Sequence, residues 1–210
     1  MEYNGVTISW LGHASFLLEH GEKKIYIDPY NIGRTRPDAD LILITHDHYD
    51  HLSVEDIDNV VSDETIIIAP ESCREKLEDL PGKLRIISVG KDAEVLGYVV
   101  SAVAAYNTNK KFHPKENGWV GYIIDFGDAT VYHSGDTDVI DEMKELSVDV
   151  ALLPVSGVYV MTPKEAAQAA VLVNAKKVVP MHYGSIVGDS SHAEQLCELL
   201  GKKAVILEKA

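Results

Sequence analysis

Three histidines and two aspartates lie within six consecutive positions, in the segment His46-Asp47-His48-Tyr49-Asp50-His51. His46 and His48 are two residues apart, so both side chains can face one point from an extended or tightly turned backbone. Asp50 and His51 are adjacent and must diverge, which suits a second metal ion beside the first. Imidazole and carboxylate ligands without a thiolate favour Zn²⁺, with Mn²⁺ or Fe²⁺ as alternatives. We therefore expect this segment to supply half of a site for two divalent ions.

Further candidate ligands follow apolar runs later in the chain. Asp136 and His182 each come at or just after the end of a predicted strand, with a glycine nearby that lets the backbone turn. His113 lies in a polar segment, 106–118, that we predict to be a long loop, and loops of that length are commonly functional. We expect the two strand-end residues to lie at the same edge as the first cluster.

Short apolar runs must position these side chains. The run Leu41-Ile42-Leu43-Ile44 predicts a buried strand that ends at the histidine cluster. Other runs predict strands over 6–10, 14–19, 24–28, 65–69, 84–89, 98–105, 119–126, 129–134, 148–153, 177–181 and 204–207. Helices are expected after Ser53, over 71–80, from Thr162, and from Ser190 or Ser191 to Gly201. Two strand-rich halves with outer helices predict a layered sandwich, and without a repeat or linker we expect one domain over residues 1–210.

Composition narrows the functional classes. With 46% hydrophobic and 25% charged residues, the chain has the balance of an ordinary globular protein. Its net charge of −14 argues against a dedicated nucleic-acid-binding module. No apolar stretch reaches the length of a membrane span, and the first residues lack a signal-peptide pattern, so we expect a cytoplasmic location. Cys73 and Cys197 lie outside any CxxC and are interpreted as buried free thiols.

Over essentially its whole length, the chain resembles the metallo-β-lactamase superfamily. The resemblance rests on four features: HxHxDH at 46–51, a later loop histidine, Gly135-Asp136-Thr137 and the C-terminal His182. The segments 10–15 and 27–29 are similar to a subgroup of metal-dependent hydrolases that includes ascorbate-6-phosphate lactonase and N-acylphosphatidylethanolamine phospholipase D. The resemblance implies an α/β (α+β) fold, a four-layer αββα sandwich.

The resemblance also implies a ligand set for two divalent ions. The first ion would be held by His46, His48 and His113, the second by Asp50, His51 and His182, and Asp136 would bridge the two. The implied activity is that of a hydrolase in which a hydroxide activated by both ions attacks an ester, lactone or phosphodiester bond, with catalytic roles for Asp50 and His182. His13 is expected behind the ligands, whereas His20, His133 and His192 are expected to be structural or exposed.

Two loops carry the candidate substrate-binding residues, Arg34 and Arg36 in the first and Lys110 and Lys111 in the second. Because Arg and Lys pair with phosphate and carboxylate, we expect a small anionic substrate, although ordinary solvated loop charges remain the alternative. A noncatalytic metal- or ligand-binding module is the alternative function. A diiron redox protein is less favoured, because such superfamily members usually carry Glu where this chain has His48. The sequence leaves the oligomeric state open.

Overall fold

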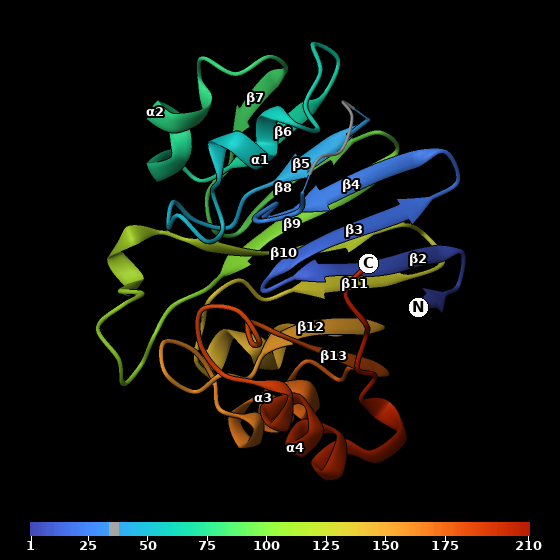
Figure 1. The fold of residues 1–210 in the computed structure, drawn as a ribbon, viewed down its shortest axis with the longest axis vertical. Helices are drawn as coiled ribbons and strands as arrows, with labels where there is room; N and C mark the ends of the chain where they lie inside the picture. The colour runs from blue at the N-terminus through green and yellow to red at the C-terminus, as the bar shows by residue number, and fades with distance from the viewer. Residues whose placement is uncertain (34–37) are drawn as a thin grey trace.

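The computed structural model describes residues 1–33 and 38–210. Two β-sheets pack face to face at its centre (Figure 1). The first sheet follows chain order and contains β1 (Glu2–Tyr3), β2 (Val6–Gly12), β3 (Ser15–His20), β4 (Lys23–Ile27), β5 (Leu41–Leu43), β6 (Ile66–Ala69) and β7 (Lys83–Ile86). Strands β1 to β4 are antiparallel, and β4 to β7 are parallel.

The second sheet has the order β13-β12-β11-β10-β9-β8. Its strands are β8 (Lys91–Val95), β9 (Tyr98–Ala104), β10 (Val120–Asp125), β11 (Thr130–His133), β12 (Val150–Pro154) and β13 (Lys177–Met181). Strands β8 to β11 are antiparallel and β11 to β13 parallel. Fully buried side chains of both sheets, among them Phe16, Leu18, Val120 and Tyr122, form one shared core.

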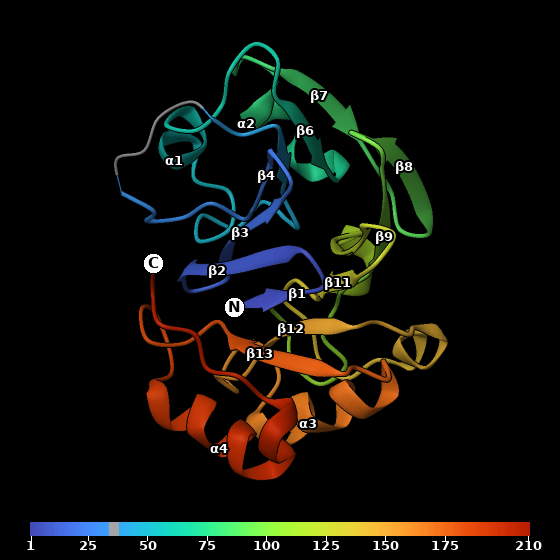
Figure 2. The same ribbon diagram turned by 90° about the vertical axis from the view of Figure 1, so that its right-hand side faces the viewer.

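Helices cover the outer face of each sheet (Figure 2). The helices α1 (Val54–Asp58) and α2 (Arg74–Leu77) lie on the first sheet, and α3 (Pro163–Leu172) and α4 (Ser190–Leu200) lie on the second. Short 3-10 helices occupy 71–73, 115–117, 141–145 and 201–203. This arrangement confirms the predicted four-layer α/β sandwich.

The N-termini of α1 and α3 are capped by neighbouring side chains. Thr162 and Glu165 form a reciprocal capping box at α3, as the sequence predicted. At α1, Ser53 accepts a hydrogen bond from the Asp56 backbone, but the shorter Asp56 carboxylate accepts instead from the backbone N–H groups of residues 31 and 32. Asp56 thereby ties the loop after β4 to α1, the helix that follows the histidine cluster.

Two predicted elements are wrong in detail, and strand β8 was missed. The strand over 204–207 is absent from the described structure: Ala204 makes only an isolated bridge to Val178, and Ile206 is exposed. The helix over 71–80 is a 3-10 turn followed by the four residues of α2. Strand β8 was not predicted, because it is an edge strand whose mostly charged, exposed residues lack an apolar alternation.

Within 1–33 and 38–210, no helix has the length and hydropathy that crossing a membrane requires.

Candidate metal centre

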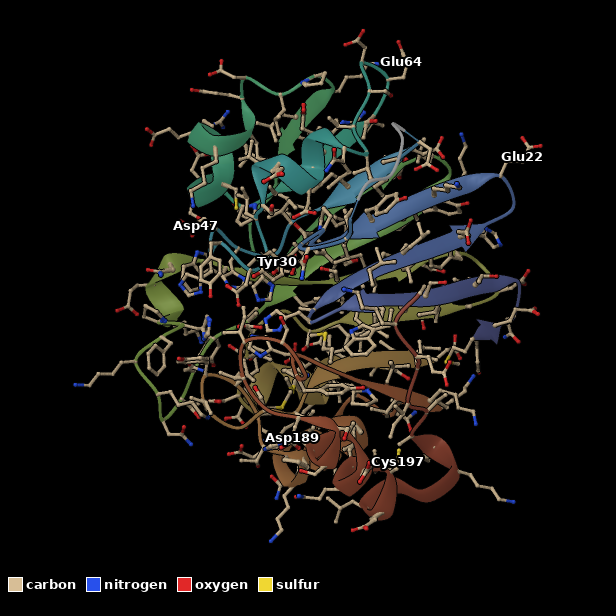
Figure 3. The ribbon with its side chains drawn as sticks, viewed as in Figure 1. Glu22, Tyr30, Asp47, Glu64, Asp189 and Cys197 are labelled. Atoms are coloured by element: carbon tan, nitrogen blue, oxygen red, sulfur yellow. The ribbon has the colours of Figure 1, made fainter. Side chains whose placement is uncertain are left out.

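The predicted ligands come together where several strands end. The loop after β5 carries residues 46–51, Asp136 follows β11 by three residues, and His182 directly follows β13. Figure 3 shows Tyr30 and Asp47, from the loops after β4 and β5, on this side of the molecule, with Glu22 of the β3–β4 turn at the opposite end. Gly135 allows the chain to reach this edge: its φ is +62°, and a Cβ there would lie 2.7 Å from the Val120 carbonyl oxygen.

One group of imidazoles contains His46, His48 and His113. Their potential ligand atoms all lie within 4.8 Å of one another, and His46 Nε2 is 3.1 Å from His48 Nδ1. His46 and His113 are buried, and His48 is half-buried. The 106–118 loop is folded so that His113 reaches the group, because Asn107 Oδ1 accepts hydrogen bonds from His113 N at 3.0 Å and from its Nδ1 at 3.1 Å.

A second group contains Asp50, His51 and His182, together with His13. Its four potential ligand atoms also lie within 4.8 Å of one another. Asp50 Oδ2 is 3.9 Å from Nε2 of both His51 and His182, and 3.0 Å from His13 Nε2. His13 has φ +51°, and its carbonyl oxygen accepts the N–H of His182 at 2.9 Å. The residue expected behind the ligands therefore contacts one of them and positions another.

Asp136 lies between the two groups. Its Oδ2 is 3.2 Å from His113 Nε2 and 3.0 Å from His182 Nε2, while its Oδ1 is 3.3 Å from His51 Nε2. Burial favours the neutral carboxyl, but the charges of His182 and His51 hold the pKa of Asp136 well below its usual value. An ionised carboxylate therefore faces a member of each group.

Each of three imidazoles is held through its Nδ1 by a neighbouring oxygen. His51 Nδ1 is 2.7 Å from Asp28 Oδ2, and His182 Nδ1 is 3.1 Å from Ser156 Oγ, while Asn107 holds His113 in the same way. In a neutral imidazole, an N–H at Nδ1 leaves the lone pair on Nε2, the nitrogen that faces the centre. These three rings are thus oriented as metal ligands are.

His46 is oriented through a relay that ends at Asp28. Thr45 Oγ1 lies 2.9 Å from His46 Nδ1 and donates its proton to Asp28 Oδ2 at 2.6 Å, so its lone pair accepts from the imidazole. Asp28 also accepts the Thr45 backbone N–H at 2.8 Å. A single fully buried carboxylate therefore orients a histidine from each group.

The pKa values of His46 and His51 are shifted in opposite directions. Burial lowers the pKa of His46 well below its usual value. Burial opposes the protonation of His51 too, but the charges of Asp136 and Asp28 raise its pKa well above the usual value.

The residues fit a bound divalent cation. Three buried atoms that face the centre make no well-aligned hydrogen bond among the described residues, although each lies 3.2 or 3.3 Å from a carboxylate oxygen or an imidazole nitrogen: His51 Nε2, His113 Nε2 and Asp136 Oδ1. Buried polar atoms without partners are costly and need an explanation, such as an ion. The donors are imidazole nitrogens and carboxylate oxygens, the ligands that Zn²⁺ and similar ions take.

Sequence reasoning missed three of the orienting residues, namely Asp28, Asn107 and Ser156. Asp28 carried a signal, since Ile27-Asp28-Pro29 places a carboxylate directly after an apolar strand. Asn107 and Ser156 carried none, because single polar residues in loops are common. Their roles depend on how the loops fold back onto the histidines.

The remaining histidines lie outside both groups. His20 Nδ1 is 3.0 Å from the Tyr98 hydroxyl, and His133 Nε2 is 2.8 Å from the Ala14 carbonyl oxygen. His192 lies in the first turn of α4 beside the cap residue Asp189. They have the structural or exposed positions that were expected. Of the two thiols, Cys73 is buried as expected and Cys197 is only half-buried; both are free.

The expected substrate-binding lysines are not in the cleft over the histidines. Lys110 forms an ion pair with the buried carboxylate of Asp138, and Lys111 is exposed on the same loop. Neither residue lines the cleft. Arg34 and Arg36 lie outside the described residues, so the structure offers no observation on them.

Comparison of the sequence with known proteins identifies a matching family and several relatives. The profile of the Beta-lactamase superfamily domain matches residues 7–182. The chain is 34% identical to a UPF0173 metal-dependent hydrolase from Pyrococcus horikoshii, an alignment that covers 96% of this chain and 95% of the relative. It is 33% identical to a UPF0173 metal-dependent hydrolase from Thermococcus kodakarensis with the same coverage.

Solved structures share the fold. A candidate metal-dependent hydrolase from Parabacteroides distasonis superposes with a TM-score of 0.85 at 36% identity, covering 97% of this chain and 94% of that one. The metallo hydrolase Igni18 from Ignicoccus hospitalis gives a TM-score of 0.78 at 26% identity, covering 98% and 96%. CmlA, a diiron β-hydroxylase from Streptomyces venezuelae, gives 0.73 at 14% identity over 99% of this chain and 53% of CmlA, which shows a common fold only.

Proposed function

Because the chain belongs to the beta-lactamase superfamily, among its UPF0173 metal-dependent hydrolases, we propose that it hydrolyses an ester, lactone or phosphodiester bond with two bound divalent ions, Zn²⁺ first among them. The observation that carries the proposal is the set of oriented imidazoles whose Nε2 atoms face the buried carboxylate of Asp136. A purely structural cluster would have no need to bury His51 Nε2 and His113 Nε2 without a well-aligned hydrogen bond.

The proposed ligands follow the two groups. His46, His48 and His113 would hold one ion, and Asp50, His51 and His182 would hold the other, with Asp136 shared between them. The support for the shared carboxylate is its position, since both of its oxygens lie 3.0 to 3.3 Å from imidazole nitrogens of the two groups.

Bound ions of this kind lower the pKa of water toward neutrality and polarise the carbonyl or phosphoryl oxygen under attack. The role of the protein's own side chains in this chemistry is to orient the attacking water. Burial raises the pKa of Asp50, but the hydrogen bond from His13 and the charge of His51 together outweigh burial and lower that pKa to about 2. Asp50 is therefore ionised at neutral pH and can accept a hydrogen bond that orients the attacking water, while His182 or a metal-bound water would help to stabilise the developing oxyanion.

The test is hydrolysis of a panel of phosphodiesters, lactones and esters before chelation, after chelation and after Zn²⁺ is restored. We expect turnover that is lost with the metal and regained with it. Metal binding without turnover of any substrate class would instead favour the noncatalytic binding module.

Asp50→Ala is the matching variant. It removes the carboxylate proposed to orient the attacking water and one proposed ligand, so we expect kcat to fall by at least about a thousandfold. Asp141→Ala is the control, because that carboxylate is exposed and pairs only with Lys144 on the surface. Turnover by Asp50→Ala close to the wild-type rate would remove Asp50 from the mechanism.

A further inference from the structure

The cleft over the histidines has apolar walls. Its volume is about 280 Å³, and its floor is formed by the candidate ligands His48, Asp50, His113, Asp136 and His182. The other residues that line it are Tyr49, Phe112, Tyr159 and Ile186. The polar groups are thus collected at the bottom and the large apolar side chains around the opening.

These wall residues are exposed although they are apolar. Tyr49 is 63% exposed, Phe112 49% and Ile186 37%. Phe112 packs edge-on against Tyr159 with their ring centroids 4.6 Å apart, so two segments distant in sequence build one wall. Apolar side chains gathered at the rim of a concave site gain free energy only when something apolar covers them.

The rim contains no free cation among the described lining residues. Of the three lysines on the neighbouring 106–118 loop, Lys110 pairs with Asp138 and Lys115 with Glu142 at 2.8 Å, and Lys111 is exposed and does not line the cleft. A second anionic group on a substrate would therefore meet aromatic and aliphatic side chains in this part of the cleft, where it would lose hydration without gaining a partner.

We infer that the substrate is an ester or lactone whose acyl or alkyl group is apolar and packs against Phe112, Tyr159 and Ile186, while the bond to be cleaved lies over the histidines. This inference rests on the proposed function. The cleft is at the lower end of the size range of ligand pockets, roughly 300 to 1,000 Å³, so the apolar group is a short chain or a single ring.

The first test compares 4-nitrophenyl acetate, butyrate and hexanoate with the anionic 4-nitrophenyl succinate on the metal-loaded protein. Burial of each added methylene is expected to raise kcat/KM by about two- to fourfold, so hexanoate should exceed acetate by at least about tenfold. Succinate should fall below butyrate. Equal kcat/KM across the chain lengths, or a preference for succinate, would overturn the inference.

Variants test whether the preference for longer acyl chains comes from the apolar side chains at the rim of the cleft. Phe112→Ala and Ile186→Ser should each reduce the ratio of hexanoate to acetate kcat/KM by about fivefold or more, whereas Phe112→Leu, which keeps an apolar wall, should retain most of it. Val171→Ser is the matched control, because Val171 is 70% exposed on α3 and does not line this cleft. A ratio that stays unchanged in both Phe112→Ala and Ile186→Ser would overturn the inference.

Binding of alkyl hydroxamates tests the apolar subsite without requiring hydrolysis, so it can be judged apart from the proposed function. The hydroxamate group is a common metal chelator, so acetohydroxamate and hexanohydroxamate differ only in the chain that meets the rim. We expect the Kd of the hexanoyl compound to be lower by at least about tenfold in calorimetry. If no ester, lactone or phosphodiester is turned over but this Kd difference is found, the hydrolase is contradicted and the apolar subsite is kept. Turnover with equal Kd values would contradict the apolar subsite and keep the hydrolase.

Discussion

At the scale of single residues, the candidate centre depends on which nitrogen of each imidazole is available. Asp28, Asn107 and Ser156 each occupy the Nδ1 side of a histidine and leave Nε2 directed inward. Most of the side chains that gather at the candidate centre could be predicted from the HxHxDH spacing and the strand-end residues. The orienting partners could not, because hydrogen bonds between residues 6, 23 and 26 positions apart leave no regular pattern in the sequence.

Asp28→Asn tests this orientation. The amide keeps the size of the carboxylate but removes its charge and one acceptor, so Thr45 and His51 cannot both be held. We expect Zn²⁺ affinity to fall by roughly ten- to a hundredfold, measured by competition with a chromophoric chelator. Asp125→Asn is the control, since Asp125 is exposed at the end of β10. Equal affinities in the two variants would show that Asp28 has no such role.

At the scale of elements, buried strands end at the site and loops close over it. The strands that lead to the ligands were predicted because their apolar runs are buried on both faces, as in β5 and β12. The edge strand β8 was missed because its residues are mostly charged and exposed. The strand predicted over 204–207 does not form, because only Ala204 bridges to the neighbouring Val178. The long 106–118 loop was predicted as irregular, but its closed position is set by Asn107.

Asn107→Ala tests the closure of that loop. The change removes the acceptor of His113 N and Nδ1 and the donor to the Tyr159 carbonyl oxygen. We expect the affinity for the ion held by His46, His48 and His113 to fall about tenfold or more, while the other site is affected less. Calorimetric titration with Zn²⁺ would resolve the two steps. Asn117→Ala, an exposed change in the same loop, should behave like the wild type; an equal loss in both variants would contradict the role of Asn107.

At the scale of the whole molecule, both sheets contribute to the same centre. The first sheet supplies residues 46–51 and the second supplies Asp136 and His182, so the ligands stay together only while the sheets stay packed. Tyr122 of β10 links the sheets directly, because its hydroxyl donates to the Ile44 carbonyl oxygen at 2.8 Å beside the end of β5. The predicted single domain follows from this shared core.

Tyr122→Phe should therefore destabilise the protein. It leaves the buried Ile44 carbonyl without this donor, and we expect the free energy of unfolding to fall by about 1 to 3 kcal/mol in a denaturant titration. Tyr132→Phe is the matched control, since the Tyr132 hydroxyl is buried without a hydrogen-bond partner in the described structure and its removal should be neutral or stabilising. Equal destabilisation by both changes would contradict the assigned link between the sheets.

The most direct test of a two-metal hydrolase is activity as a function of added metal. Zn²⁺ is titrated into chelator-stripped protein while ester, lactone or phosphodiester turnover is recorded and bound metal is measured by elemental analysis. The account predicts no turnover without metal and a plateau at about two bound equivalents. Full activity in the stripped protein, a plateau at one equivalent, or two bound equivalents with no turnover would contradict it.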